Sequence, residues 1–159
     1  MSVRDPEQGR GAAGAEPRRD WMGVLARARP EDLSRMMSGL ADLPEGDVVR
    51  GPEIGTVMVR GRAGGVGAPF NLGEMTVTRC SLRLPCGTVG HAMVQGRAHG
   101  HARRAALLDA LLQTARAEEI RRVVLAPLAD AKQARERARA ARAEASRVEF
   151  FTLVRGESG

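Results

Sequence analysis

The chain has 159 residues, of which 43% are hydrophobic, and its 25 basic and 19 acidic residues give a net charge of +6. This length suits one domain with a core of its own. No apolar run reaches the roughly 18 residues that a membrane span needs, and no charged segment followed by a short apolar one marks a secretory signal. We therefore expect a cytoplasmic protein with no membrane-spanning segment.

The numbers of cysteines and lysines bear on the cellular compartment and on the kind of surface this protein has. Cys80 and Cys86 are the two cysteines, and six residues along one strand span about 20 Å, which is too far for a disulfide. We expect free thiols in a reducing compartment. Lys132 is the one lysine, so nearly all of the positive charge is arginine. Arginine favours interfaces and anion sites, although a solvated basic surface has the same composition.

The N-terminal third is predicted to hold a leader and a helical hairpin. Residues 1–19 combine Gly, Ala, Pro and charge without an apolar period, which predicts a disordered leader, followed by a single domain over residues 20–159. Asp20 is a suitable N-cap for a first helix, and Pro30 suits the first turn of a second. Apolar residues then recur at helical spacing: Leu33, Met36, Met37, Leu40 and Leu43.

A strand and a glycine-rich segment come next. Residues 51–62 are strand-like, and residues 61–67 read GRAGGVG. Backbone N–H groups of such loops can bind phosphate, but this one lacks the Gly-Lys-Ser/Thr ending of a P-loop, and no helix opens directly after it. We expect a connection between strands, and Arg60 and Arg62 keep an anion site open as the alternative.

The central feature is a β-hairpin within residues 70–97, with strands over 76–84 and 88–95 and a turn at 85–87. A type I turn with Gly87 in the left-handed conformation pairs Leu84 with Thr88. A two-residue loop instead pairs Leu84 with Val89. The second register gathers one apolar face: Cys80, Leu82, Leu84, Val89, His91 and Met93. A one-residue slip moves every side chain to the other face. Turn chemistry favours the first register and the hydrophobic pattern favours the second, so both stay open. In either register two arginines share a face, Arg79 and Arg83.

Two helices are predicted toward the C-terminus. The first, over residues 101–115, has a wide apolar stripe and should be buried against the sheet. The second, over residues 131–146, has an alanine seam and a basic surface. Residues 123–126 between them predict a short strand or the end of a loop, because Pro127 cannot extend a central strand. The chain then ends in an apolar run, residues 149–155, whose Phe150 and Phe151 we expect to be docked.

Together these segments predict an α+β fold. It has an N-terminal helical hairpin, a small antiparallel β-sheet built on the central hairpin, and two packing helices toward the C-terminus.

Signals for catalysis or metal binding are weak. His91, His99 and His101 lie close in the sequence, but no Cys, Asp or Glu stands nearby at ligand spacing. We expect His91 in the core and His101 at the entry of a helix. No nucleophile–base pair is apparent either, so we predict no catalytic residues and no metal in this chain.

A basic nucleic-acid-binding module is the alternative function class, and it rests on charge alone. No aromatic residues interleave the arginines of residues 131–146, as base stacking requires. The second N-terminal helix exposes Arg35 and little else that a recognition helix uses. The pattern therefore favours a protein partner over nucleic acid.

Several long and unusual strings carry a family resemblance. They are WMGVLARA, VMVRGRAGGVGAPFNLGEMTVTRCSLRL, GTVGHAMVQGR, HARRAALLDALLQ, APL and ASRVEFFTLVRG, within residues 21–156. With these strings the chain resembles the PhnG family, the G subunit of the bacterial carbon–phosphorus lyase complex.

This resemblance implies a required but non-catalytic subunit of α-D-ribose 1-methylphosphonate 5-triphosphate synthase, in phosphonate catabolism. In that family the G, H and I subunits act with an ATP-binding-cassette-like L subunit on an alkylphosphonate and MgATP, with release of adenine. The G, H, I and J subunits form a core complex. The resemblance thus implies that the catalytic residues lie in a partner subunit, that MgATP is a substrate of the complex, and that no cofactor is bound by this chain alone.

The residues themselves indicate where this chain meets its partners or an anionic substrate. Candidates for anion binding or an interface are Arg60, Arg62, Arg79, Arg83, Arg97 and His101. Candidates for an interface at the C-terminus are Phe150, Phe151 and Arg155.

Overall fold

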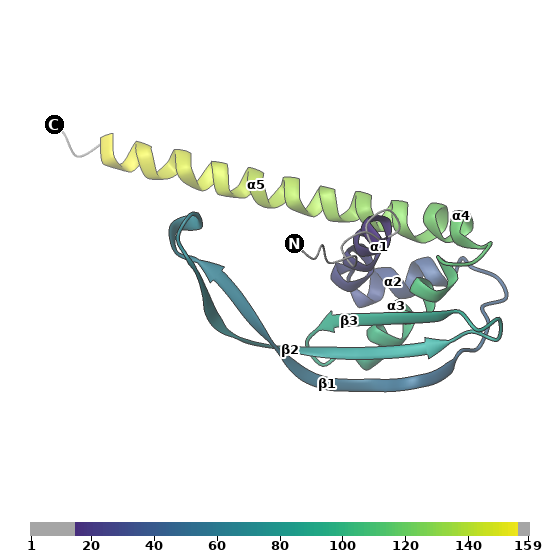
Figure 1. Cartoon of the computed structure of the whole chain (residues 1–159). Coiled ribbons are helices and arrows are strands. Elements are labelled where there is room, and N and C mark those ends of the chain that lie inside the picture. The colour runs from purple at the N-terminus through teal and green to yellow at the C-terminus, as the bar shows by residue number, and fades with distance from the viewer. Residues whose placement is uncertain (1–14, 156–159) are drawn as a thin grey trace, which may run out of the picture.

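A three-stranded antiparallel sheet in the order β1-β2-β3 carries the helices on one face (Figure 1). Its strands are β1 (Asp47–Arg62), β2 (Pro69–Arg83) and β3 (Val89–Gln95). The computed structural model describes residues 15–155, and the side chains of residues 18–145. The predicted α+β class is confirmed, with its antiparallel sheet between N-terminal and C-terminal helices.

The N-terminal helical hairpin is formed by α1 (Ala15–Arg27) and α2 (Pro30–Met37). Pro30 opens α2 as predicted, with Glu31 and Asp32 in its first turn, where carboxylates meet the positive end of the helix dipole. The predicted helix start at Asp20 is wrong, because α1 already begins at Ala15. Arg18, placed in the leader by sequence, is a helical residue that forms an ion pair with the core.

From His99 to Arg155 the chain is helical apart from a turn at residues 112–116. α3 (His99–Leu111) is followed by the short α4 (Ala117–Ile120), the π-helical turn η2 (Arg121–Leu125) and the long α5 (Ala126–Arg155). The prediction of a strand or loop at residues 123–126 is therefore wrong. Pro127 follows η2 by two residues inside one continuous helical run from Ala117. Proline removes a helical N–H donor, and the π-helical turn directly before it is an interruption of the regular helix.

The turn at residues 85–87 decides the register of the central hairpin. The Leu84 N–H donates to the Thr88 carbonyl at 2.9 Å, the Gly87 N–H donates to the Leu84 carbonyl at 2.8 Å, and Gly87 has a φ of 88°. This is the register that turn chemistry favoured. It pairs Cys80 with Ala92 and Ser81 with His91, so the expectation of a core His91 is wrong: its side chain is exposed on the other face.

Gly90 lets α3 lie directly on β3. A Cβ at this position would stand 2.0 Å from the Ala106 carbonyl oxygen and 2.6 Å from the Ala110 nitrogen. Neighbouring α3 positions that pack here are alanines, and Ala106 and Ala110 have no exposed surface. The alanine-rich stripe of α3 thus serves a close helix-to-strand approach.

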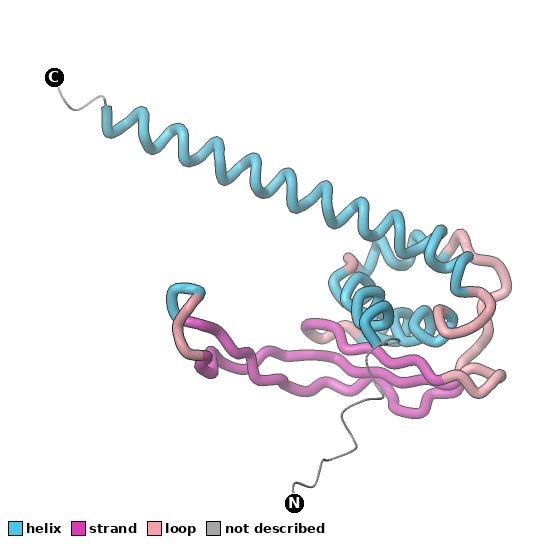
Figure 2. Tube along the Cα trace, turned by 45° about the horizontal axis from the view of Figure 1, so that its top comes forward, coloured by secondary structure: helices cyan, strands magenta, loops and turns pink. Residues whose placement is uncertain are grey.

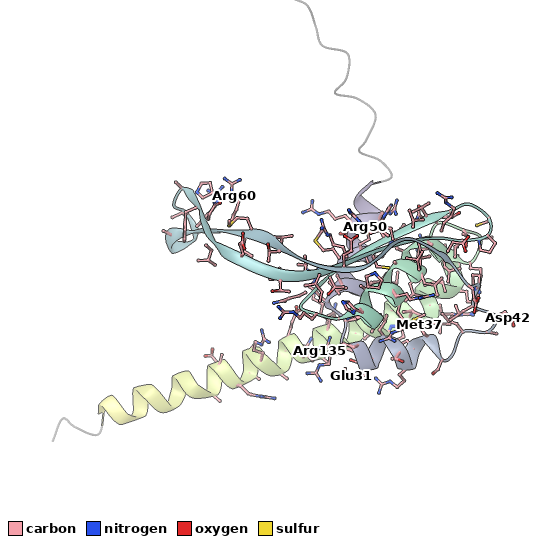
Figure 3. All side chains as sticks on the ribbon, turned by 90° about the horizontal axis from the view of Figure 1, so that it is seen from below. Glu31, Met37, Asp42, Arg50, Arg60 and Arg135 are labelled. Atoms are coloured by element: carbon pink, nitrogen blue, oxygen red, sulfur yellow. The ribbon has the colours of Figure 1, made fainter. Side chains whose placement is uncertain are left out.

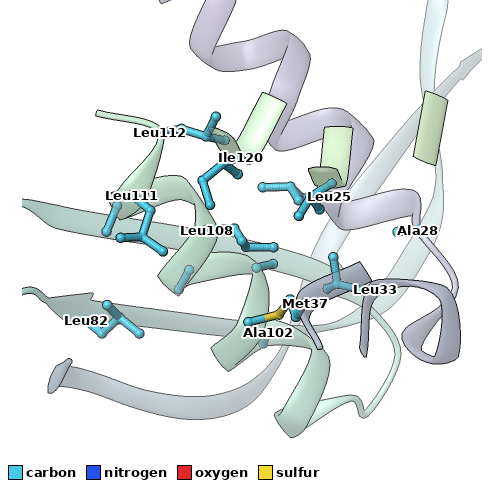
Figure 4. Close-up of a cluster of buried hydrophobic side chains, with 14 of the residues drawn as sticks. Leu25, Ala28, Leu33, Met37, Leu82, Ala102, Leu108, Leu111, Leu112 and Ile120 are labelled. Carbon is cyan, nitrogen blue, oxygen red and sulfur yellow. The ribbon is translucent and has the colours of Figure 1, made fainter. Parts of the chain in front are cut away.

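The core lies between the sheet and the helices (Figure 4). Its largest fully buried apolar side chains come from α1, α2, β2, β3, α3, α4 and η2: Leu25, Leu33, Leu82, Val94, Leu108, Leu111, Ile120 and Val124. Each such burial stabilises the fold by about 1.5–3 kcal/mol. No aromatic side chain is among them, in keeping with a composition of one Trp and three Phe.

Two elements project from this core toward the same side (Figures 1 and 2). One is the β ribbon, which we define as residues 57–62 of β1 paired with residues 69–75 of β2, together with the connection between them. The other is the distal part of α5. Helix α5 as a whole contacts η2, α1 and α2, and Leu128 near its start is buried. The pairing of β2 with β3 ends near Val77, so the ribbon has two strands and no third.

Candidate functional site

Two of the predicted anion-binding arginines, Arg60 and Arg62, lie at the far end of the β ribbon. Both are exposed, and Arg62 Nη1 donates to the Gly67 carbonyl at 3.2 Å. The glycine-rich segment between them and β2 connects two strands, as predicted from its sequence. It contains a short 3-10 turn, η1 (Ala63–Gly65), and its backbone encloses no described hollow.

Arg79 and Arg83 share one face of the sheet, opposite the face that packs on α3. Arg79 stands across from Glu53 in the ladder, and Arg83 across from Asp47. The Nε of Arg79 is buried and has no hydrogen-bond partner among the described residues. Arg97 is exposed in the turn between β3 and α3.

These arginines do not converge on one point. Arg79 stands across the ladder from Glu53 of β1, and Arg60 lies seven residues further along β1. At the usual strand rise, the two arginines are therefore roughly 23 Å apart. Figure 3 shows Arg60 far along the ribbon, well away from Arg50, near the body of the molecule. A row of arginines along a sheet suits an extended surface better than a small anion.

The histidines are placed in three separate environments. His101, in the first turn of α3 as predicted, is 5% exposed, and its Nε2 donates to the Leu25 carbonyl at 2.8 Å. That bond ties α3 to α1 and leaves the ring without a free face toward solvent. His91 Nδ1 lies 2.8 Å from the Ser81 hydroxyl, and His99 is exposed. Within the described residues, no three His, Cys, Asp or Glu side chains are grouped as metal ligands would be.

The residue that sequence reasoning missed is Asp109. Its carboxylate has no exposed surface and accepts hydrogen bonds from Arg18 Nε at 3.2 Å, Arg18 Nη2 at 2.7 Å, Trp21 Nε1 at 2.8 Å and the His91 backbone N–H at 2.9 Å. It thereby joins α1, α3 and β3. The signal in the sequence was a lone acidic residue inside the apolar stripe of a buried helix, since such a charge needs a partner.

The described thiols differ in reactivity. Burial raises the pKa of the Cys80 thiol, and nearby Arg103 opposes this effect. Cys86 is exposed in the hairpin turn, where hydrogen bonding to Thr88 lowers the pKa of its thiol. Among the described residues, no carboxylate or histidine is hydrogen-bonded to either sulfur, and Cys86 is bonded to the Thr88 hydroxyl, which is no general base.

Two hollows adjoin each other beside α1. The larger, about 590 Å³, is lined by Ala28, Pro30, Val57, Met75, Val77 and Met93, together with the polar side chains of Arg27, Gln95 and His101. The smaller, about 220 Å³, lies between α1 and β3 and shares Ala26 and Met93 with the larger. No carboxylate lines either hollow. His91 lines the smaller hollow and His101 the larger, and neither histidine has a carboxylate partner in these linings. The lining therefore supplies no carboxylate–histidine pair for acid–base chemistry.

The β ribbon exposes large apolar side chains. Met58 is 51% exposed, Leu72 65%, Phe70 45% and Val66 91%. Leu72 is the extra residue of β2 at the bulge between the pairs Val59–Gly73 and Arg60–Asn71. Side chains of this size on a projecting ribbon are typical of an interaction surface.

α5 is basic along its described surface. Arg135 bridges to Asp32 of α2 at 3.3 Å, and Lys132 lies 3.6 Å from Glu136. Figure 3 shows Arg135 where α5 lies beside the body, near Glu31, and Arg60 far out on the ribbon. Phe150, Phe151 and Arg155 belong to the last turns of α5, but their side chains lie outside the described residues, so their docking stays a prediction.

Comparison with known proteins identifies the family. The family model described as "Phosphonate metabolism protein PhnG" matches residues 16–156. This chain belongs to the PhnG family. A PhnG relative from Rhizobium meliloti (strain 1021), named "Alpha-D-ribose 1-methylphosphonate 5-triphosphate synthase subunit PhnG", is 46% identical over 145 residues, which cover 91% of this chain and 93% of the relative.

Family membership confirms the resemblance drawn from the sequence strings and places the chain in phosphonate metabolism as a subunit. The PhnG match begins at Glu16, within α1 and ahead of Arg18. Among the described residues, no helix is both long enough and apolar enough to cross a membrane.

Proposed function

We propose that this chain is a required, non-catalytic subunit of an α-D-ribose 1-methylphosphonate 5-triphosphate synthase that works in the cytoplasm. Its partners are the H, I and J subunits of the carbon–phosphorus lyase complex, together with the ATP-binding-cassette-like L subunit. The proposal is carried by the 46% identity to a relative named as a subunit of that synthase, over 91% of the chain.

In this proposal the complex transfers an alkylphosphonate onto the ribose of MgATP. The bond from ribose carbon to adenine breaks, a bond from the same carbon to a phosphonate oxygen forms, and adenine leaves. MgATP is a substrate of the whole complex, and this chain alone holds no cofactor. Arg60, Arg62, Arg79, Arg83 and Arg97 face a partner subunit or the anionic substrate.

The non-catalytic role is supported by how the described polar groups are used. The carboxylate of Asp109 is fully occupied by four donors, and the ring of His101 is held by a backbone carbonyl. The apolar hollows contain no carboxylate. General acid–base chemistry needs a positioned pair within reach of substrate, so we assign that pair to a partner.

Reconstitution tests the proposal directly. Purified H, I, J and L subunits are mixed with methylphosphonate and MgATP, with and without this chain, and free adenine is measured by liquid chromatography. We expect release to depend on this chain, and isothermal titration of ATP onto the chain alone to give no binding. Full adenine release without the chain, or release by the chain alone, would contradict the proposal.

Single alanine substitutions test the arginines in the same reconstituted mixture. We expect Arg60→Ala and Arg62→Ala to weaken assembly by about 1 kcal/mol each, as rim charges do. Turnover per assembled complex should change little if the contact is with a subunit, and should fall if the arginine meets substrate. Unchanged assembly and turnover for all five arginines would remove them from the proposal.

The basic net charge also fits a nucleic-acid-binding module, which is the second candidate. Such a module binds random duplex with an affinity that falls steeply as salt rises. We expect no such binding by the chain at 150 mM salt, because the ribbon exposes apolar side chains where a nucleic-acid ribbon would carry cations. Salt-dependent binding by a chain that does not join the other subunits would favour the module.

A further inference from the structure

The β ribbon is an element whose own sequence cannot keep it stable in water. A two-stranded hairpin without a third strand or a covering helix is marginal at best. Between residues 57 and 75 no side chain is buried, and the pairing with β3 ends at Val77. Beyond its base at Val57 and Met75 the ribbon does not pack on the core, and its stability depends on a cover that the described residues do not supply.

One face of the ribbon is an apolar stripe that runs back to the body. Val57 stands across from Met75, and Gly61 across from Phe70, so these residues share a face. A Cβ on Gly61 would lie 3.7 Å from the Phe70 ring and 4.0 Å from Leu72, which adds Leu72 to that face. Val57 and Met75 also line the larger hollow. The stripe is thus continuous with a recess in the body.

The opposite face of the ribbon is mostly polar. Met58 stands across from Glu74 there, and Arg60 stands across from Asn71. One apolar and one polar face is the alternation of an antiparallel hairpin that packs on one side only. The apolar face of the ribbon therefore needs a cover, and the arginines point to the other side.

The positive charge of the ribbon and of α5 indicates which kind of partner covers the ribbon. Arg60 and Arg62 at its far end outnumber its one acid, Glu74, and α5 projects toward the same side with a basic surface (Figure 1). Like charges directly opposed cost free energy, so a second copy of this chain, itself at +6, is disfavoured. Nucleic acid offers no apolar groove of matching size. A protein groove with apolar walls and carboxylates at its rim satisfies both features.

We propose that residues 57–75 form an insertion arm that is buried in an apolar, carboxylate-rimmed groove of a different subunit. This inference rests on the proposed function, because it takes that subunit to be a member of the same complex. Phe70 and Leu72 fill the groove, and Arg60 and Arg62 meet the carboxylates at its rim.

A pair of matched double variants tests the apolar contact. Phe70→Ser with Leu72→Ser removes the two side chains over Gly61, and Val48→Ser with Val49→Ser removes two side chains of β1 that are similarly exposed, 45% and 53%, but lie outside the arm. Each full-length variant is co-expressed with the other subunits. We expect the arm variant to lose co-purification by about tenfold or more, as for interface anchors, and the control to stay within about twofold of the unaltered chain. Equal effects of the two variants overturn the inference.

Hydrogen exchange measures burial of the arm without any substitution. The unaltered chain is compared alone and in the purified complex, with peptides that cover residues 57–75. We expect these amides to exchange fast in the isolated chain and at least about tenfold slower in the complex, because local opening governs exchange in weakly held segments.

The outcomes separate the two proposals. If the unaltered chain joins the complex while residues 57–75 exchange as fast as in isolation, the insertion arm is wrong and the proposed function stands. If the chain does not join the complex, both fail. Slow exchange of the arm in the isolated chain, with a dimeric mass, shows a second copy as the occupant and overturns the inference. So does slow exchange that appears only on addition of duplex DNA.

Charge reversal supplies an independent readout. Arg60→Glu with Arg62→Glu should slow association with the complex and reverse the sign of its salt dependence, since rim charges act mainly on the association rate. The control is Arg103→Glu with Arg122→Glu, two exposed arginines of α3 and η2 that lie outside both projections. Association that is unaffected by the arm reversal shows that no carboxylates line the rim and overturns that part of the inference.

Discussion

At the scale of single residues, Asp109 organises the N-terminal half. Among the residues whose side chains are described, it is the fully buried carboxylate, and its donors come from α1 and β3. Trp21 is one of those donors, and its ring also contacts η2. The guanidinium carbon of Arg121 lies 5.8 Å from the centroid of that ring. A side chain on α3 thus determines where α1 lies.

Asp109→Asn should destabilise the fold by about 3 kcal/mol, because the partly buried Arg18 guanidinium and two further N–H donors lose a charged, fully buried acceptor. Arg18→Ala should cost less, about 1 kcal/mol, since its side chain is 32% exposed. Urea unfolding measures both changes, and Asp130→Asn on the exposed surface of α5 is the control. Equal stability of Asp109→Asn and the control would show that the network is not a stabilising one.

Cys86 should react with iodoacetamide far faster than Cys80 in the folded chain. Because hydrogen bonding to Thr88 lowers the pKa of the Cys86 thiol, its rate should rise at lower pH than for a free cysteine. Thr88→Ala should move that rise back to higher pH. Mass spectrometry of alkylated peptides gives the rate at each pH, and labelling of Cys80 at the same rate would contradict the burial that raises its pKa.

At the scale of elements, close approach determines the packing of α3 on β3. The hydrophobic pattern of the hairpin favoured a register that the structure does not have. In the observed register Gly90 comes to lie against the backbone of α3, where no side chain fits. A hydrophobic pattern records only where apolar side chains lie. It therefore cannot predict a helix-to-strand contact that requires a residue without a side chain, as at Gly90.

Gly90→Ala should destabilise the chain by about 3 kcal/mol or prevent folding, since its Cβ would meet backbone atoms that cannot turn aside. The control is Gly51→Ala, whose Cβ would have no heavy atom within 4 Å. Thermal unfolding compares the two variants. A Gly90→Ala chain as stable as the control would mean that α3 can move away from β3 at no cost.

Leu128 anchors the start of α5 to the core. It is 2% exposed, whereas described side chains beyond Arg135 on the helix are exposed. Leu128→Ala should cost about 2–4 kcal/mol and speed amide exchange along α5 more than in α3. Gln133→Ala, on the exposed side of the same helix, is the control. Unchanged exchange in α5 would place its anchor elsewhere.

At the scale of the whole molecule, a core of helices on a sheet supports two projections. Among the described residues, core side chains come from the helices, from β2, β3 and η2, and from the start of α5, and none comes from β1 or from the distal part of α5. The projections therefore carry little of the stability and are available for contacts with other subunits.

Replacing residues 58–74 with Asn-Gly should leave the core folded, because Val57 and Met75 are paired and a two-residue Asn-Gly turn can close them. We expect the unfolding temperature to change by less than about 5 °C, measured by circular dichroism. The shortened chain should no longer join the complex. Loss of folding would show that the ribbon belongs to the core.

Local sequence was sufficient for much of this protein. Periodicity, Pro30 and the turn residues predicted the α+β class, the second helix and both strands of the central hairpin, since these depend on neighbours in the chain. The family followed from long strings of residues. The sequence also indicated which arginines are candidates for an interface. It did not indicate that they lie far apart along the sheet.

Only the tertiary structure decided the rest, because those features depend on residues distant in sequence. The start of α1 depends on Arg18 reaching Asp109, 91 residues away. The hairpin register combines a local turn with the approach of α3 at Gly90. Whether the apolar residues around Phe70 and Leu72 are core or surface depends on where β3 ends, and β3 ends at Gln95, before it can cover them.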